Sequence, residues 1–263
     1  IASDCGGLDC NDNSAWTNPL AVDFLSGHCT AANTWIQTSL GSDTGKATWP
    51  RMVFDKNGAI HLTHYASETD TIYYSTNAAG DWSTSPISPT GIGGTNASLQ
   101  IAPDGSIHVT FLDLQNGWLR YTTNQSGEWK NTIVDNSKFV GWFSSLLYRA
   151  DGTRIVTYRS AIDSAVRIAT CKQNCTSNQD TVSGWEQYTV DDNGDVGKFA
   201  TLRETNDGLL RVAYQDVTGQ RLLLATAASP SEPWAIETVN EAVGTGYSIG
   251  MVEGPQNVLF ISF

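Results

Sequence analysis

The 263-residue chain has few charged residues and no long apolar segment. Charged side chains make up 16% of it, against about a quarter in an ordinary soluble domain, which argues against a largely helical protein. Basic residues are the scarcer kind, because 15 Lys and Arg stand against 27 Asp and Glu. The resulting net charge of −12 argues against a nucleic acid or an anionic membrane as partner. No apolar run approaches the roughly 20 residues that a membrane-spanning helix needs.

Only five cysteines are present. Cys171 and Cys175 lie in CKQNC, and Cys5 and Cys10 lie in CGGLDC. Neither spacing is CxxC and no pair of histidines accompanies them, so we favour short disulfide bonds over metal ligation. The odd number leaves two alternatives: Cys29 is free, or it pairs with Cys5 or Cys10. The amino terminus is not a signal peptide, and we interpret it as the mature end of a secreted protein.

What the chain does contain is an internal repeat. A tryptophan that opens a strand recurs with spacings of 47, 47, 56 and 49 residues, at Trp35, Trp82, Trp129, Trp185 and Trp234. Each interval holds a turn with Asn-Gly or Asp-Gly, which is a strong hairpin signal because glycine adopts positive φ without a steric clash. Alternating strands are predicted after these turns, at 59–65, 106–113, 153–160 and 209–216. Third strands follow, at 72–77, 119–124, 166–171 and 221–226.

The two ends of the chain carry incomplete units. After Trp234 come an outer strand and then the segments SIGMVEG (248–254) and NVLFISF (257–263), which read as inner strands. Before Trp35, LAVDFL (20–25) resembles a third strand. We therefore predict an all-β fold, a five-bladed β-propeller of four-stranded antiparallel blades, with the ring closed by pairing N-terminal outer strands with C-terminal inner strands. An open solenoid or a two-sheet sandwich is the alternative, but an open array leaves unpaired strand edges.

The repeat resembles the sialidase-like, BNR-type propeller repeats of secreted bacterial and fungal proteins. The resemblance rests on the pattern DG-x-x-H-[VL]-x-[YF]…L-x-Y-x-T-N-x-x-G-x-W and covers residues 20–263. The Asp-box of true sialidases, S-x-D-x-G-x-x-W, is only echoed, since STNAAGDW (75–82) and TTNQSGEW (122–129) have Asn in place of the Asp. The resemblance implies the architecture, and this departure argues against sialidase activity. Residues 1–19 precede the pattern, and we expect them to form a disulfide-tied extension of the single domain 20–263.

Candidate channel residues follow from aligning the first strand of each unit on the turn after it. One row of equivalent positions contains Trp49, Asn96, Phe143, Phe199 and Tyr247. Two residues further on come Arg51, Ser98, Ser145, Thr201 and Ile249, and then Val53, Gln100, Leu147, Arg203 and Met251. The intervening rows are small or apolar, as at Ala97, Leu99, Ser144 and Ala200. Because side chains alternate along a strand, we expect the small and apolar rows to pack between blades and the mixed rows to face the channel.

This alignment predicts a channel with an aromatic rim and two arginines. Aromatic rims suit the faces of sugars, and paired arginines in an acidic protein suit a carboxylate-bearing ligand. Alternatively, Arg51 and Arg203 form salt bridges with Asp43, Glu204 or Glu253 and fill the channel. The expected ligand-binding residues are Trp49, Arg51, Gln100, Trp142, Lys198, Arg203 and Tyr247.

The histidines suggest an enzymatic alternative. His61 and His108 occupy equivalent positions, so we interpret them as part of the scaffold. His64 departs from the repeat, because its counterparts are Phe111, Tyr158 and Tyr214, and Tyr65 follows it. β-Elimination on a uronate needs a base, an acid and a cation. If the protein is an enzyme of this kind, His64 and Tyr65 are the candidate catalytic residues.

Carboxylates for glycoside hydrolysis must form a pair across a cleft. Asp113 and Asp216 recur at equivalent positions, which favours a scaffold role, and the other candidates lie in neighbouring loops, at Glu68, Asp70 and Asp163. The acidic run VDDNGD (190–195) resembles a calcium loop, but Val196 follows it where a glycine is expected and no Glu closes it. We expect a linking loop and no cofactor, with a structural calcium ion as the alternative.

The leading prediction is a secreted, monomeric, lectin-like propeller that binds carbohydrate, in particular an acidic glycan, at one central-channel site. The alternative is a glycoside hydrolase or uronate polysaccharide lyase acting at the same channel mouth, and a third class is a rigid scaffold for protein contacts. The loops that enter the first strands differ from unit to unit, at 41–48, 88–96, 136–142, 193–198 and 241–247. This difference favours a single central site over five equal ones.

Overall fold

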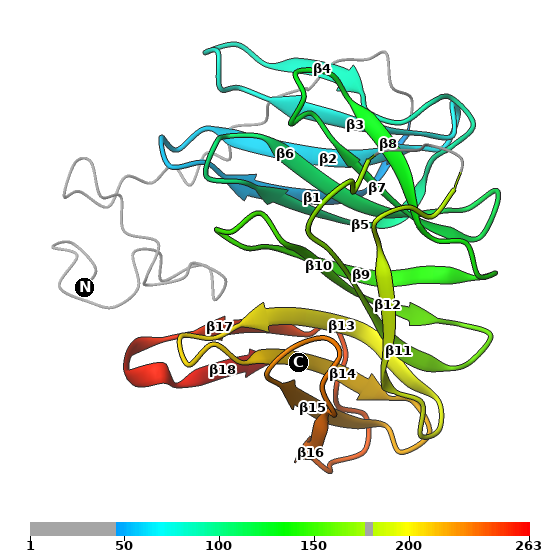
Figure 1. Cartoon of the computed structure of the whole chain (residues 1–263), viewed down its shortest axis with the longest axis vertical. Helices are drawn as coiled ribbons and strands as arrows, with labels where there is room; N and C mark the ends of the chain where they lie inside the picture. Colours follow the sequence, from blue (N-terminus) through cyan, green and yellow to red (C-terminus); the bar gives the residue numbers. More distant parts are fainter. Residues whose placement is uncertain (1–45, 177–180) are drawn as a thin grey trace, which may run out of the picture. The chain divides into compact units, whose positions relative to one another are not determined.

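The structure is a computed structural model that describes residues 46–176 and 181–263, all within the compact unit Leu40–Phe263. These residues form four antiparallel sheets of four consecutive strands each and a further two-stranded sheet (Figure 1). The first two sheets consist of β1 (Ala47–Phe54), β2 (Ile60–Ala66), β3 (Thr71–Thr76) and β4 (Ser83–Pro86), and of β5 (Gly94–Ile101), β6 (Ile107–Asp113), β7 (Trp118–Thr123) and β8 (Lys130–Asp135). In these ranges no helix is long and apolar enough to span a membrane.

The third and fourth sheets repeat this order. They consist of β9 (Val140–Tyr148), β10 (Arg154–Ser160), β11 (Ala165–Cys171) and β12 (Glu186–Asp191), and of β13 (Val196–Glu204), β14 (Leu210–Asp216), β15 (Arg221–Ala227) and β16 (Ala235–Asn240). The two-stranded sheet consists of β17 (Gly250–Glu253) and β18 (Leu259–Ser262), joined by a 3-10 turn at Pro255–Asn257. The predicted all-β class is confirmed, and the predicted second and third strands match β2, β3 and their counterparts within one residue at each end.

The hairpin turns form as their residue types predict. Gly105 has φ +85° and Gly208 has φ +80°, a left-handed conformation that costs glycine little because it has no Cβ. At the same turns Asp104 Oδ1 accepts a hydrogen bond from the backbone N of Ser106 at 2.9 Å, and Asp207 Oδ1 accepts one from Leu209 at 3.1 Å. The carboxylate thus closes the turn on its own backbone.

Successive sheets pack face to face through apolar side chains, as blades do in a β-propeller. Phe111 packs between the first and second sheets, Tyr158 between the second and third, and Tyr214 between the third and fourth; all three are fully buried. Close approach at the start of the inner strands β5, β9 and β13 depends on glycine. A Cβ on Gly197 would lie 2.8 Å from Cγ2 of Val166 in the preceding sheet, and one on Gly94 would overlap the carbonyl oxygen of Leu112.

The ring that we predicted does not close within the described residues. The sheet of β17 and β18 packs one face on the fourth sheet, where Met251 and Ile261 contact the cluster of Leu222 and Leu224. Its other face leaves Phe260 exposed. The predicted N-terminal strand 20–25 and Trp35 lie outside the described residues, so ring closure and the boundary at residue 19 remain predictions.

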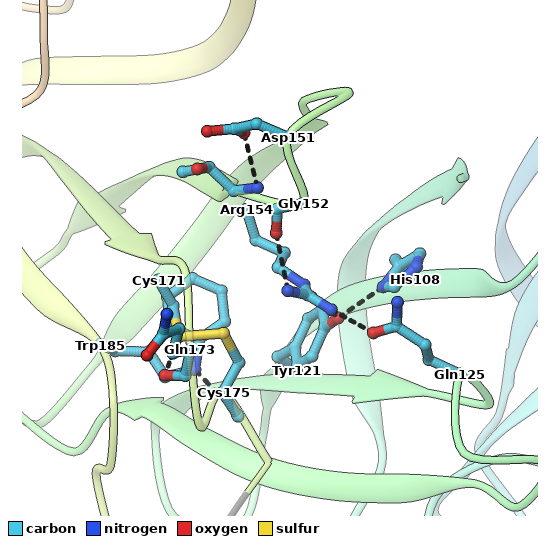
Figure 2. Close-up of a disulfide and its surroundings, with 11 residues drawn as sticks. His108, Tyr121, Gln125, Asp151, Gly152, Arg154, Cys171, Gln173, Cys175 and Trp185 are labelled. Atoms are coloured by element: carbon cyan, nitrogen blue, oxygen red, sulfur yellow. Dashed lines mark hydrogen bonds between the residues drawn. A yellow bond between two sulfur atoms is a disulfide. The ribbon is translucent and has the colours of Figure 1, made fainter. Parts of the chain in front are cut away.

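The predicted Cys171–Cys175 disulfide is present, with Cα atoms 5.8 Å apart (Figure 2). Both cysteines are buried, and Trp185 covers them, its Nε1 donating a hydrogen bond to the carbonyl oxygen of Cys175 at 3.2 Å. The bridge therefore holds the end of β11 against the segment that leads to β12. Cys5, Cys10 and Cys29 lie outside the described residues.

Candidate functional site

A cavity of about 480 Å³ opens where the inner strands of successive sheets begin. Its lining comes from β1, β5, β9 and β13 together with the loop before β17. The lining residues are Trp49, Arg51, Asn96, Ser98, Phe143, Ser144, Ser145, Phe199, Ala200, Thr201, Ser248 and Ile249. Five repeat units therefore contribute to the cavity, and among the described lining residues Arg51 is the one with a charged side chain.

A bulge in each inner strand directs side chains into this cavity. The pairing register between β1 and β2 breaks between Thr48 and Arg51, and the equivalent break recurs in β5, β9 and β13. At each break one residue adopts a left-handed φ: +54° at Trp49, +57° at Asn96, +53° at Phe143 and +56° at Phe199. This conformation is uncommon for any residue other than glycine and is strained for a bulky one.

The bulge explains which rows of the sequence alignment reach the cavity. At each break the inner strand has two residues where its partner strand has one, so the alternation of side chains along the strand is interrupted. Ser144 and Ala200 therefore line the cavity, although we expected them to pack between blades. In the fifth unit the left-handed residue is Ser248 (φ +48°), one position beyond the predicted Tyr247.

Aromatic rings dominate one wall of the site. The ring centroids of Phe143 and Phe199 are 4.9 Å apart, and those of Phe199 and Tyr247 are 5.6 Å apart, each pair inclined by 50°. Phe143 and Phe199 are half-buried and Tyr247 is 50% exposed. The three rings form a continuous row across β9, β13 and the loop before β17.

Hydroxyl groups beneath the cavity join the inner strands to one another. Ser98 Oγ accepts a hydrogen bond from the backbone N of Leu146 at 2.9 Å. Ser144 Oγ donates one to the carbonyl oxygen of Asn96 at 2.7 Å. Because the inner strands belong to different sheets, these bonds supply the connection that a backbone ladder would otherwise give.

The predicted ligand-binding residues fall into two groups. Trp49 and Arg51 line the cavity, and Tyr247 adjoins it through the ring of Phe199. Four others are not part of the lining: Gln100, Trp142, Lys198 and Arg203.

Neither arginine has the salt bridge that we considered with Glu204 or Glu253. Glu204 pairs with Arg149, whose Nη2 lies 2.6 Å from Oε1, and Glu253 accepts the backbone N–H of Asn206 at 2.9 Å. Within the described ranges the hydrogen bond of Arg51 goes to the carbonyl oxygen of Pro50 at 3.3 Å. Asp43 lies outside those ranges.

His64 and Tyr65 lie away from the cavity lining. His64 is 4% exposed and stacks on Tyr73, with ring centroids 5.6 Å apart and planes inclined by 8°. Burial lowers the pKa of His64 below its ordinary value. Tyr65 donates its hydroxyl to Asp70 Oδ1 at 2.9 Å, and burial together with this carboxylate raises the pKa of Tyr65 to about 12. Neither residue is part of the described cavity lining.

A buried polar cluster that sequence analysis did not identify lies between the second and third sheets (Figure 2). Arg154 is 8% exposed, and its guanidinium donates to Tyr121 Oη at 3.3 Å, to Gly152 O at 2.7 Å and to Gln125 Oε1. His108 Nδ1 lies 2.5 Å from Tyr121 Oη. Burial and the positive charge of Arg154 lower the pKa of His108 to about 3.

The signal for this cluster was present in the sequence. Arg154 occupies the position that Ile60, Ile107 and Leu210 take in the other units, so a charged residue replaces a core residue. The cluster lies at the end of the sheets where the inner strands finish, because Tyr148, the last residue of β9, packs on His108 with ring centroids 4.3 Å apart. It is therefore separate from the cavity.

Carboxylates are absent from the described lining of the cavity. Asp113 pairs with Arg120 at 2.7 Å and Asp216 with Arg221 at 2.8 Å, both as partly or fully buried structural pairs. Asp163 pairs with Arg167. These contacts agree with the scaffold role expected for Asp113 and Asp216.

The acidic run 190–195 is engaged in protein contacts. Asp191 Oδ2 accepts the hydroxyl of Tyr214 at 2.6 Å, and Asp195 Oδ1 lies 2.5 Å from Nη2 of Arg159. In the part of the chain that the structure describes, no group of three or more His, Cys, Asp or Glu side chains is arranged to hold a metal ion.

Comparisons with known proteins place the chain by its fold. No family model matches the sequence, and no curated protein matches it. Among solved structures, it is similar to an α-L-arabinofuranosidase from Fusarium graminearum, with a TM-score of 0.59 and 11% identity over 82% of this chain and 74% of that one. It is also similar to a protein of unknown function from Dyadobacter fermentans (TM-score 0.57, 14% identity, 84% of this chain and 75% of that one).

A third similar structure is a GH43 β-1,3-galactosidase bound to galactodeoxynojirimycin, with a TM-score of 0.52 and 10% identity over 81% of this chain and 92% of that one. At these identities the similarity shows a common fold. Our leading prediction of a lectin-like protein is corrected by these comparisons. The two structures with a stated activity, the arabinofuranosidase and the galactosidase, are both glycoside hydrolases. The hydrolase alternative is the one that the comparisons favour.

Proposed function

We propose that the protein is a glycoside hydrolase that holds a sugar in the cavity on its inner strands. The observation that carries the proposal is the aromatic lining, in which Trp49, Phe143 and Phe199 project from three different sheets into one cavity. Such rings stack on the C–H faces of a sugar, and the adjacent hydroxyl and amide groups can bind its hydroxyls. The proposed substrate is therefore a carbohydrate.

Hydrolysis requires two carboxyl groups, about 5–5.5 Å apart for retention or about 6.5–9.5 Å apart for inversion. Two candidates lie on loops that lead directly into the lining: Asp195, four residues before Phe199, and Glu241, seven before Ser248. Asp195, which an ion pair with Arg159 holds in place, is the candidate base or nucleophile. Glu241 is exposed and is the candidate acid.

The lyase alternative receives less support. Elimination needs a base and an acid at the substrate, and His64 and Tyr65 are engaged with Tyr73 and Asp70 away from the cavity. We therefore propose hydrolysis and no second activity.

The proposal includes secretion, a monomeric state, and a closed five-bladed ring of the sialidase-like type. The disulfide Cys171–Cys175 supports secretion, because such bonds persist in oxidising compartments. Exposed apolar residues on β1, at Met52 and Phe54, and on β17 and β18, at Val252 and Phe260, support the ring. Between the four described four-stranded sheets, the corresponding apolar faces are covered by the neighbouring sheet.

The test is release of nitrophenol from a panel of aryl glycosides, including α-L-arabinofuranosides and β-galactosides, and of reducing sugar from plant and microbial polysaccharides. We expect at least one substrate to be cleaved, Trp49→Ala to lower kcat/KM, and Asp195→Asn and Glu241→Gln to lower kcat. Tyr188→Phe on β12 is the matched control, since it removes only a contact with Glu186. Cleavage of none would refute the proposal, and an unsaturated uronate product would replace it with a lyase.

A further inference from the structure

The row of three rings extends beyond the lining of the cavity. Phe143 and Phe199 line the cavity, whereas Tyr247 continues the row outside the lining. We infer that the substrate is an oligosaccharide or polysaccharide, whose chain leaves the cavity along Phe143, Phe199 and Tyr247. This inference rests on the proposed function and names the substrate class of the same site.

Backbone strain at the first two rings argues for a role beyond packing. Phe143 and Phe199 hold left-handed φ values of +53° and +56°, a conformation that costs free energy for a bulky side chain. The equivalent position tolerates a smaller polar residue, since Asn96 occupies it in the second unit. A smaller residue at these two positions would have avoided the strain. Because both rings face the cavity, we take the strain as support for a ligand that stacks on them.

Tyr247 lacks a structural reason for its position. It is 50% exposed, lies on the loop before β17, and makes its ring contact with Phe199. Within the described ranges its hydroxyl donates no hydrogen bond. An exposed ring that extends a half-buried row is stabilised most when a ligand removes its face from water.

The arrangement fits a chain of repeating rings. One aromatic side chain comes from each of three consecutive units, with centroid spacings of 4.9 and 5.6 Å. Single-stranded nucleic acids bind in a similar way, each base on its own aromatic side chain, but they need a basic groove. This chain carries a net charge of −12, and Arg51 is the charged member of the described lining. The hydroxyl of Thr201 in the lining suits neutral sugar hydroxyls instead.

The experiment compares substrates of increasing length. The probes are the aryl monoglycoside cleaved in the panel above and oligosaccharides of the same sugar. We expect kcat/KM of the wild type to rise with chain length. Tyr247→Ala should lower it by about tenfold more for the longer chains than for the monoglycoside, since each stacked ring contributes at about this level on comparable platforms. Phe139→Ala is the matched control, because Phe139 is 56% exposed and lies outside the lining.

Binding is measured in parallel by tryptophan fluorescence, because Trp49 lines the cavity. Cello-, xylo-, arabino- and galacto-oligosaccharides are titrated irrespective of turnover. Tighter binding of longer chains that Tyr247→Ala abolishes supports the inference even if no hydrolysis occurs, in which case the proposed function alone fails. Hydrolysis or binding with no dependence on chain length, or an equal loss on mono- and oligosaccharides in Tyr247→Ala, overturns the inference and leaves the hydrolase proposal intact. No binding of any oligosaccharide also overturns it.

Discussion

The hydroxyl of Ser145 accepts a hydrogen bond from the backbone N–H of Leu202 over 3.0 Å and thereby joins β9 to β13. Ser98 makes the equivalent bond with Leu146 one sheet earlier. The inner strands of successive sheets belong to separate ladders, so these serines connect sheets that otherwise meet through side-chain packing. The same strands form the cavity, which makes its shape dependent on these bonds.

Ser145→Ala should lower the free energy of unfolding by about 1 kcal/mol, because the backbone N–H of Leu202 loses its acceptor. Ser98→Ala should have a similar effect. Denaturant titration measures both, with the exposed Ser231→Ala as control. An unchanged midpoint in Ser145→Ala would show that water replaces the hydroxyl.

Gly94→Ala should prevent folding or destabilise the protein by several kcal/mol, because the new Cβ would overlap the backbone carbonyl of Leu112. Gly58→Ala is the matched control. Gly58 has φ +84° and open space around it, so the cost should stay near 1 kcal/mol. Circular dichroism and urea titration compare the two, and equal losses would contradict the predicted close approach.

His64→Phe should stabilise the protein by about 1 kcal/mol. His64 is buried, its Nε2 has no hydrogen-bond partner in the part of the chain described, and burial lowers its pKa. Phe111 fills the equivalent position in the second unit. Thermal unfolding measures the change, and hydrolytic activity should stay at the wild-type level. A loss of activity without a loss of stability would restore His64 as a catalytic candidate.

His108 should make the protein less stable in acid. Burial and Arg154 lower its pKa from 6.5 to about 3, so the unfolded chain takes up a proton between these values and the folded chain does not. The free energy of unfolding therefore falls as pH decreases from about 6.5 towards 3, by about 1.4 kcal/mol per pH unit for this group. Its contribution does not change above pH 7.

His108→Gln tests this dependence, since it keeps a polar group near Tyr121. Urea titrations at several pH values should show the wild type more stable than the variant at pH 7 and the difference shrinking as the pH falls. A difference independent of pH would mean that His108 becomes protonated in the folded protein.

The double variant Cys171→Ala/Cys175→Ala should lose about 2 kcal/mol, as expected for opening a short loop. The fluorescence of Trp185 should also change, because its indole donates to the carbonyl of Cys175. Thermal unfolding without reductant measures the loss and leaves the remaining cysteines unaffected. Stability equal to the wild type would show that packing of Trp185 holds this segment unaided.

Much of the fold was predictable from local chemistry. The turns at Asp104-Gly105 and Asp207-Gly208 form because a carboxylate caps the backbone and glycine accepts positive φ, both of which are properties of adjacent residues. The alternation in 106–113 likewise led to a strand at Ile107–Asp113. The pairing Cys171–Cys175 was predictable because only three residues lie between the two cysteines.

The candidate site was only partly predictable. Trp49 and Arg51 were expected in the channel and line the cavity, whereas Gln100 and Arg203 do not. The alignment assumed regular alternation, and the bulges interrupt it. A bulge at a Trp or Phe leaves no signature in residue type, because it follows from contacts between sheets and not from the preference of the residue itself.

The sequence by itself determined the repeat, the hairpins, the local disulfide and the acidic, all-β character of this protein, since each depends on neighbours within a few residues or on composition. The tertiary structure decided which side chains meet. Phe143 and Phe199 are 56 residues apart in the chain, yet their rings lie 4.9 Å apart beside a shared cavity. Arg154 likewise reaches His108 and Tyr121 only because two sheets pack face to face. Contacts of this kind depend on the register and spacing of whole sheets, which no short stretch of the chain specifies.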